Sequence, residues 1–112
     1  MVKKIADSGQ DIGLGTMIKA ICARPKMYAG NSNFLTVAAF IDGFAYGSEK
    51  RHDELRKFNV WLSGKLKFSP NVAWWSGLLH EYPNSEDALQ KLPGLFDEFS
   101  GKKNRSSDSM QQ

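Results

Sequence analysis

The strongest structural signal in the chain is the stretch Phe34-Leu35-Thr36-Val37-Ala38-Ala39-Phe40-Ile41-Asp42-Gly43-Phe44-Ala45. Its apolar residues recur three or four positions apart, which is the spacing of one face of an α-helix. That face contains Phe34, Val37, Ala38, Ile41 and Ala45. Leu35, Ala39 and Phe40 make most of the remaining circumference apolar as well. Because a helix that is apolar nearly all round avoids water on every side, we expect it at the centre of the core.

A second helix is predicted before this one. Its apolar stripe is Leu14, Met17, Ile18, Ile21 and Cys22. Pro25 ends it, because the residue before a proline avoids the helical region. In the run Arg24-Pro25-Lys26-Met27-Tyr28-Ala29-Gly30 we predict a helix stop, with Met27 and Tyr28 turned inward and Gly30 at positive φ. The alternative for this run is a loop that contacts a partner.

Three more helices are predicted after the central one. The first begins near His52 or Asp53, and the second begins near Val72. The last is capped by Asn84 or its neighbour, and Pro93 lies inside it. Proline removes a hydrogen bond from a helix, so we expect a kink or two short helices there.

No segment shows a convincing strand pattern, so the predicted class is all-α. A chain of 112 residues corresponds to one domain. We expect a compact single-domain bundle of four to six helices over residues 11–100. Residues 1–10 are predicted to form a flexible N-terminal arm. Residues 101–112 are polar and are predicted to form a disordered tail.

The net charge of +3 comes from the ends of the chain. Residues 5–100 contain ten basic and eleven acidic residues, a net charge of −1. From Lys50 to Lys67 six basic residues face two acidic ones, whereas residues 68–100 carry five acidic residues and only Lys91. The second half is therefore an acidic lobe, which can attract a partner of opposite charge. The alternative is a set of ordinary solvated helix faces.

Several protein classes are disfavoured. One cysteine, Cys22, cannot form an intramolecular disulfide, which favours a cytoplasmic protein. The N-terminus turns polar where a secretion signal needs an apolar segment. The longest apolar stretch is too short and too interrupted to span a bilayer, so no membrane association is expected.

The residues able to do chemistry are few. Cys22 lies on an apolar stripe, where a thiol is unreactive. His52 and His80 lack the spacing of a zinc site, and His80-Glu81 forms an acid–base pair only if folding adds a third group. Nucleotide-binding glycine loops and nucleophile motifs are absent. We therefore expect no enzyme activity, no cofactor and no metal.

Trp74 and Trp75 are adjacent, so on a helix they point about 100° apart. One is expected in the core and the other is a candidate anchor for a partner, although both can be packed. An exposed tryptophan can also stack on a base. The nearby acidic residues repel phosphate, so this face favours a protein partner.

The opposite charge pattern leaves one alternative function open. The basic strip from Lys50 to Lys67 can bind a phosphate backbone, as in a nucleic-acid-associated regulatory protein. No aromatic or glycine module accompanies it, which favours a solvated face.

The order of motifs along the chain resembles a class of small bacterial proteins. These motifs are Arg24-Pro25-x-Met27-Tyr28-x-Gly30, Ile41-Asp42-Gly43-Phe44, Phe58-Asn59-Val60-Trp61-Leu62, the Trp74-Trp75 helix, and the helix from Ser85-Glu86-Asp87-Ala88-Leu89 to Phe96-Asp97-Glu98-Phe99. From about Ala23 to Phe99 they are similar to small immunity proteins encoded beside polymorphic toxins, including those of contact-dependent growth inhibition.

The resemblance implies a cytoplasmic, non-enzymatic protein that forms a 1:1 complex with the C-terminal domain of one cognate toxin. Such a toxin is often a basic nuclease, with an RNase favoured, and the immunity protein covers its active site or substrate groove. The acidic side chains would then replace phosphates, and the aromatic ones would anchor the complex. The candidate toxin-binding residues are Trp74, Trp75, Glu81, Tyr82, Glu86, Asp87, Asp97 and Glu98.

Overall fold

The computed structural model describes residues 12–111, with side chains described as far as Gly101. This part of the chain is helical and contains no strand, which confirms the predicted all-α class. Its helices are α2 (Leu14–Ala23), α3 (Pro25–Ala29), α4 (Phe34–Tyr46), α5 (Glu49–Leu66), α6 (Trp74–Glu81) and α7 (Ser85–Gln111). The predicted arm over residues 1–10 lies outside the described residues.

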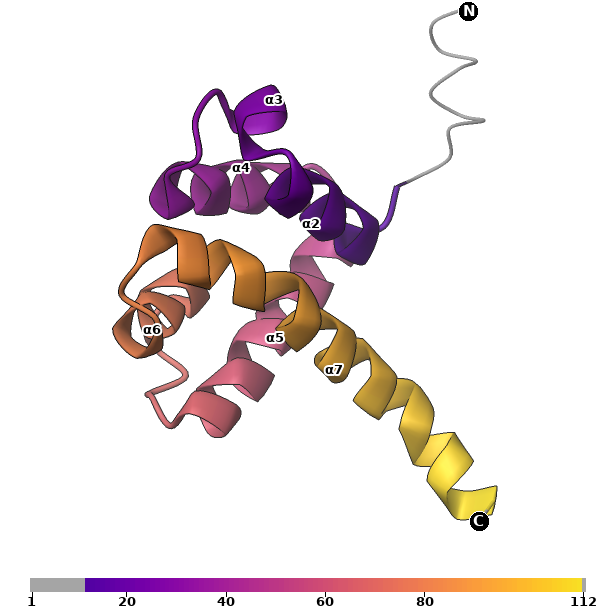
Figure 1. Cartoon of the computed structure of the whole chain (residues 1–112). Helices are drawn as coiled ribbons and strands as arrows, with labels where there is room; N and C mark the ends of the chain where they lie inside the picture. Colours follow the sequence, from indigo (N-terminus) through magenta and orange to yellow (C-terminus); the bar gives the residue numbers. More distant parts are fainter. Residues whose placement is uncertain (1–11, 112) are drawn as a thin grey trace, which may run out of the picture.

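The helices divide into two groups along the chain. In Figure 1, α2, α3 and α4 lie together at the top, and α5, α6 and α7 lie below them. α7 contacts α2, α4, α5 and α6, so the last helix joins the two groups. α4 packs against α2, α3, α5 and α7.

Aromatic rings fill the lower part of the core. Phe58 on α5 is fully buried, and its ring centroid lies 5.0 Å from that of Phe96 and 5.5 Å from that of Phe99. Trp61 and Trp74 complete the cluster around it. Tilted and edge-to-face arrangements predominate, which suits the quadrupoles of the rings.

Only one face of the central helix, α4, is buried, whereas burial on all sides was predicted. All five residues of the expected inner face of α4 are buried, as the helical spacing predicts. The opposite face is open: Leu35 is 48%, Phe40 37% and Tyr46 71% exposed. The expectation of burial on all sides was therefore wrong. A domain this small has too little surrounding chain to cover both sides of a helix.

The run after α2 also differs from its prediction. Pro25 ends α2 and occupies the first turn of a short helix, α3, where its fixed φ is favourable. Gly30 has φ +89°, which confirms the predicted left-handed turn. Met27 is 66% exposed and Tyr28 is also exposed, so the prediction that both turn inward was wrong. Five residues form little more than one turn, and this turn leaves both side chains in solvent.

Two helix boundaries need correction. α5 begins at Glu49, earlier than predicted, because the Ser48 hydroxyl accepts a hydrogen bond from the Arg51 amide and caps the first turn. α7 continues through Pro93 as one helix. Its backbone extends to Gln111, but the side chains beyond Gly101 lie outside the described residues, so the predicted disordered tail stays a prediction.

Candidate functional site

The two adjacent tryptophans have different environments. Trp74 is 3% exposed, and its ring packs edge-on against Phe34. Its indole Nε1 donates a hydrogen bond to Oδ1 of Asp42, at 2.9 Å. Trp75 is half-buried at the edge of the core. Of the two candidate anchors, only Trp75 keeps surface for a partner.

Trp75 lines a groove of about 330 Å³ between α4, α5 and the loop before α6. Its floor and walls include Asp42, Tyr46, His52, Asn59, Val72 and Trp75, and we call it the Asp42 groove. The Asn59 side-chain amide donates to the carbonyl oxygens of Pro70 (3.3 Å) and Val72 (3.1 Å). These bonds fasten the loop to α5 and hold one wall in place. Sequence reasoning missed this groove, although a lone carboxylate in the apolar stretch was a signal for it.

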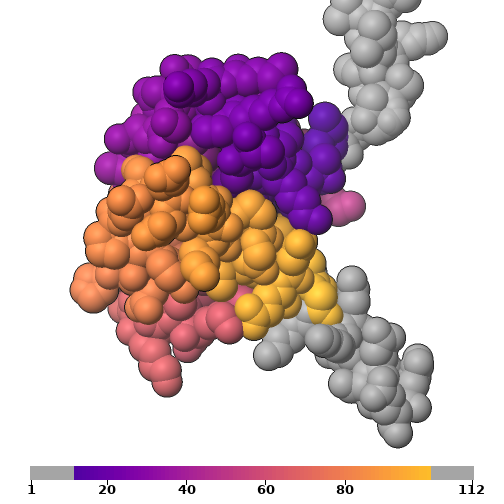
Figure 2. All heavy atoms as spheres, in the orientation of Figure 1, coloured from indigo at the N-terminus to yellow at the C-terminus, as the bar shows by residue number. Residues whose placement is uncertain are grey.

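A second surface lies where α6 meets α7. It comprises Glu81, Tyr82, Glu86 and Asp87, and we call it the junction surface. The orange segment of Figure 2 contains it, at the surface between the N-terminal helices and α5. The three carboxylates are exposed, and none has an ion-pair partner among the described side chains. Tyr82 is half-buried, with the Lys91 ammonium 5.6 Å from its ring centroid.

The start of α7 explains why two of these carboxylates are held together. Oδ1 of Asn84 accepts hydrogen bonds from the amides of Glu86 (2.8 Å) and Asp87 (3.2 Å), which caps the helix. Both acidic side chains then lie in the first turn, where the helix dipole favours negative charge. The junction surface is therefore a stable site for concentrated negative charge.

The remaining two acidic residues of the predicted interface lie apart from this surface. Asp97 pairs with Lys19 of α2 at 3.3 Å, and Glu98 pairs with Lys65 of α5 at 2.8 Å. Ten residues of helix separate Asp87 from Asp97, a rise of about 15 Å. Three of the predicted carboxylates thus lie within seven residues of one another at the junction of α6 and α7, whereas the other two connect α7 to its neighbours.

Most of the basic strip between Lys50 and Lys67 is occupied by intramolecular contacts. The Arg51 guanidinium lies 4.0 Å from the Phe44 ring centroid, and its Nε donates to the Phe44 carbonyl. Lys65 pairs with Glu98. With Arg56 and Lys57, which are described next, four of the six basic residues of the strip form contacts within the fold.

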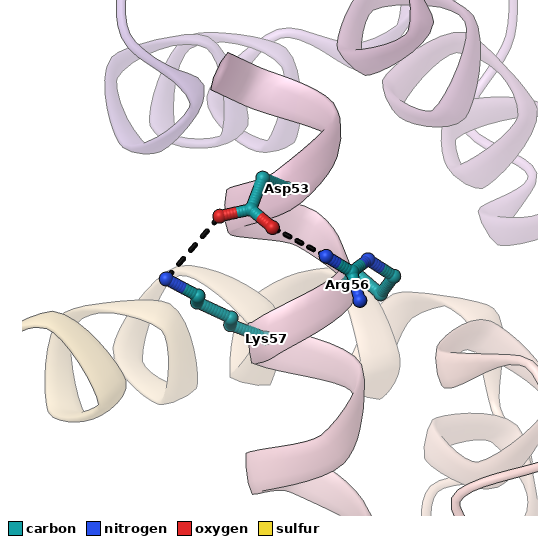
Figure 3. A network of polar contacts seen from close by, with 3 residues as sticks. All are labelled: Asp53, Arg56 and Lys57. Atoms are coloured by element: carbon teal, nitrogen blue, oxygen red, sulfur yellow. Dashed lines mark hydrogen bonds and ion pairs between the residues drawn. The ribbon is translucent and has the colours of Figure 1, made fainter. Parts of the chain in front are cut away.

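The middle of the strip forms a small network on α5. Figure 3 shows Asp53 between Arg56 and Lys57, with an ion pair to each. Hydrogen bonds from Lys57 and Arg56 lower the pKa of the Asp53 carboxyl below its usual value of 3.8. The acidic residue keeps its charge and offsets the strip at its centre, which weakens its attraction for phosphate.

The candidate chemical groups are dispersed. Burial raises the pKa of the Cys22 thiol to about 12, so it stays protonated. His80 and Glu81 are exposed and form no hydrogen bond or ion pair with another described side chain. His52 stacks on Tyr46, with ring centroids 4.6 Å apart. No three His, Cys, Asp or Glu side chains within the described range are grouped as metal ligands.

No helix in the described range is long and apolar enough to cross a bilayer. No protein-family model, curated protein or solved structure matches the chain. The two surfaces, one acidic and one a groove with a carboxylate, are the features on which a function can be built.

Proposed function

We propose that this chain is an immunity protein that binds a cognate bacterial toxin domain and neutralises it by covering its active site or substrate groove. The observation that carries the proposal is the junction surface, where Glu81, Glu86 and Asp87 are exposed and have no ion-pair partner among the described side chains. A nuclease holds phosphates in a positively charged groove. Carboxylates can occupy those positions through charge-assisted hydrogen bonds to Arg and Lys.

The aromatic side chains supply the apolar part of such an interface. Tyr82 directly follows Glu81 at the end of α6, and Trp75 lies seven residues before it, in the first turn of that helix. Both are half-buried, so part of each ring is already ordered before a partner binds. Tyrosine and tryptophan are enriched among the residues that dominate binding energy. The toxin is a basic nuclease domain, with an RNase favoured, and the complex is 1:1 in the cytoplasm.

A protein partner is favoured over nucleic acid by the distribution of free charge. The exposed carboxylates of the junction surface lack cationic partners in the described part of the chain, whereas the basic strip is mostly paired. Unpaired charge is available to a partner without breaking an internal contact. The resemblance of residues 23–99 to small immunity proteins supports the same proposal.

The first test is a pull-down with the tagged protein from its source cells, combined with sequencing of the adjoining gene. We expect capture of a toxin C-terminal domain in near one-to-one ratio. Recovery of nucleic acid alone, with an affinity that falls steeply with salt, would transfer the function to the basic strip.

The second test reverses charge on the junction surface. Glu86→Lys together with Asp87→Lys should weaken toxin binding by at least about a hundredfold, since charge-assisted bonds become repulsive contacts. The matched control is Glu49→Lys with Glu54→Lys on α5, which changes net charge equally and also alters a first turn. Equal affinity of both double variants for the toxin, with unchanged helical circular dichroism spectra, would show that the junction surface does not bind the toxin.

A further inference from the structure

Asp42 is the only charged residue of the apolar stretch that forms α4. It is half-buried, and one carboxylate oxygen accepts the indole hydrogen bond from Trp74. An asparagine could also accept that bond, because the amide has a carbonyl oxygen, but the charged carboxylate makes the bond stronger. The indole N–H is neutral, so the bond to Trp74 leaves the negative charge of Asp42 without a counter-ion. No cationic side chain of the described residues lies within ion-pair distance of it.

The one lysine or arginine that lines the Asp42 groove is engaged elsewhere. Arg56 forms an ion pair with Asp53, which also holds Lys57 (Figure 3). Among the described residues, Asp42 thus lines the groove without an ion-pair partner, because the Arg56 guanidinium, which also lines the groove, is paired with Asp53. A half-buried carboxylate without a cation is free to form charge-assisted hydrogen bonds with an incoming one.

The other walls suit a cation with an apolar stem. The Tyr46 and His52 rings stack on each other, and Trp75 and Val72 line the same groove. Aromatic faces attract guanidinium and ammonium groups. Methylene groups of Arg or Lys can lie along such walls while the head reaches the carboxylate. A volume of about 330 Å³ is at the small end of binding pockets, which favours one side chain over a larger ligand.

Part of the rim of the groove is apolar. Tyr46 and Val60, which line it, are well exposed. An apolar rim excludes water from a central polar contact when a partner covers it, which strengthens that contact. The charge, walls and volume of the Asp42 groove therefore suit one cationic side chain.

We propose that the Asp42 groove receives an arginine or lysine side chain of a protein partner, with Asp42 as its counter-ion and Tyr46, His52 and Trp75 as its walls. The proposal deepens the proposed function, because it rests on the partner being a protein and assigns a second contact point on it. In this arrangement the junction surface contacts the positive groove of the toxin, and the Asp42 groove holds one cationic side chain of the same domain.

The test uses the free protein and two small probes, N-acetyl-arginine amide and the neutral N-acetyl-norleucine amide. The reporter is the indole N–H resonance of Trp74, which is bonded directly to Asp42. At low salt we expect a saturable shift of this resonance with the arginine probe. With the norleucine probe the shift should be absent or not saturable. Equal responses to the two probes, or no response, overturns the proposal.

The variant Asp42→Asn keeps the acceptor for Trp74 and removes the charge. Its dissociation constant for the arginine probe should rise about tenfold, as expected when a hydrogen bond between charged groups is lost. Glu49→Gln is the matched control, because it removes one negative charge outside the groove and should leave the constant unchanged. An unchanged constant in Asp42→Asn overturns the role of the carboxylate. Tyr46→Ala should also weaken binding of the arginine probe. Because the Tyr46 side chain is highly exposed, this second variant should still fold.

The outcome separates this inference from the proposed function. If the pull-down captures a toxin domain that Asp42→Asn binds as tightly as the unaltered protein does, the groove is not its contact and only this inference fails. If no toxin domain is captured while the arginine probe binds through Asp42, the proposed function fails, and the Asp42 groove is still a binding site for a cationic side chain. Dimerisation of the chain that Asp42→Asn abolishes would assign the groove to a second copy and overturn the proposal.

Discussion

The two faces of α4 have similar composition and opposite environments. The inner face packs Phe34, Val37 and Ile41 into the core, and all three are fully buried. The outer face exposes Leu35, Phe40 and Tyr46 to solvent. Apolar composition therefore shows that a helix favours contact on all sides, but not that its own chain supplies that contact. An exposed apolar helix face of this kind is typical of an interaction surface.

The largest expected effect is the difference in stability between two alanine substitutions on α4, one on its buried face and one on its exposed face. Ile41→Ala should destabilise the fold by about 2–5 kcal/mol, because it leaves a cavity in a fully packed region. Leu35→Ala should change the free energy of unfolding by no more than about 0.5 kcal/mol, since half of the side chain is already in water. Urea unfolding followed by circular dichroism measures both.

A large cost for Leu35→Ala in the isolated protein would break this comparison. It would mean that the outer face is covered in solution, and a stability that rises with protein concentration would then identify a second copy as the cover.

The adjacent tryptophans extend the comparison to α6. Trp74→Phe should cost about 1–3 kcal/mol, because it removes the bond to Asp42 and leaves part of the core empty. Trp75→Phe should cost less than about 1 kcal/mol, since this ring is only half-buried. Thermal unfolding of the two variants gives the comparison directly. Equal losses of stability would contradict the distinction between a core tryptophan and a surface one.

Two glycines give effects of opposite sign. Gly43 lies within the helix on the open side of α4, and an added Cβ meets nothing within 4 Å. Gly43→Ala should therefore stabilise the protein by about 0.5–1 kcal/mol. Gly30→Ala should destabilise it by about 1 kcal/mol, because φ +89° is unfavourable for a residue with a Cβ. Destabilisation by Gly43→Ala would show that something packs against the outer face.

The smallest effect belongs to the exposed ion pairs of α5. The pKa of Asp53 lies below its usual 3.8, so its contribution to stability is complete above that value. That contribution is lost as the pH falls through the lower, folded-state pKa. Asp53→Asn should remove this part of the acid dependence and leave stability at neutral pH nearly unchanged. A carboxyl titration by NMR, giving a pKa at or above 3.8, would contradict the network.

The fold class and most of the core were predictable because helical periodicity is a local property. The stripes of Leu14–Ala23 and of the inner face of α4 follow directly from their spacing. The cap at Ser48 was missed because it depends on one hydroxyl in a polar segment that has no apolar period. Of the two alternatives for Pro93, a kink or two short helices, the second is wrong, since α7 continues as one helix: packing against other helices can outweigh the hydrogen bond that proline removes.

The candidate site was predictable only in part. The acidic residues at the start of α7 are close in sequence, so their clustering follows from the chain itself. The pairing of Asp97 and Glu98 with lysines of distant helices requires the tertiary fold. The Asp42 groove requires it as well, because its walls come from residues up to 33 positions apart along the chain. Asp42 alone marks it in the sequence, as a charge within an apolar stretch.

The packing of α2 against α7 has a consequence for synthesis on the ribosome. A Cβ at Gly15 would stand 3.1 Å from the Phe96 ring, and Lys19 pairs with Asp97. The first described helix is thus completed by the last. Until α7 emerges, the apolar stripe of α2 lacks part of its cover, so this domain can close only after α7 has been synthesised. Truncation within α7 should accordingly leave a chain that aggregates or is degraded, not a shorter domain that still folds.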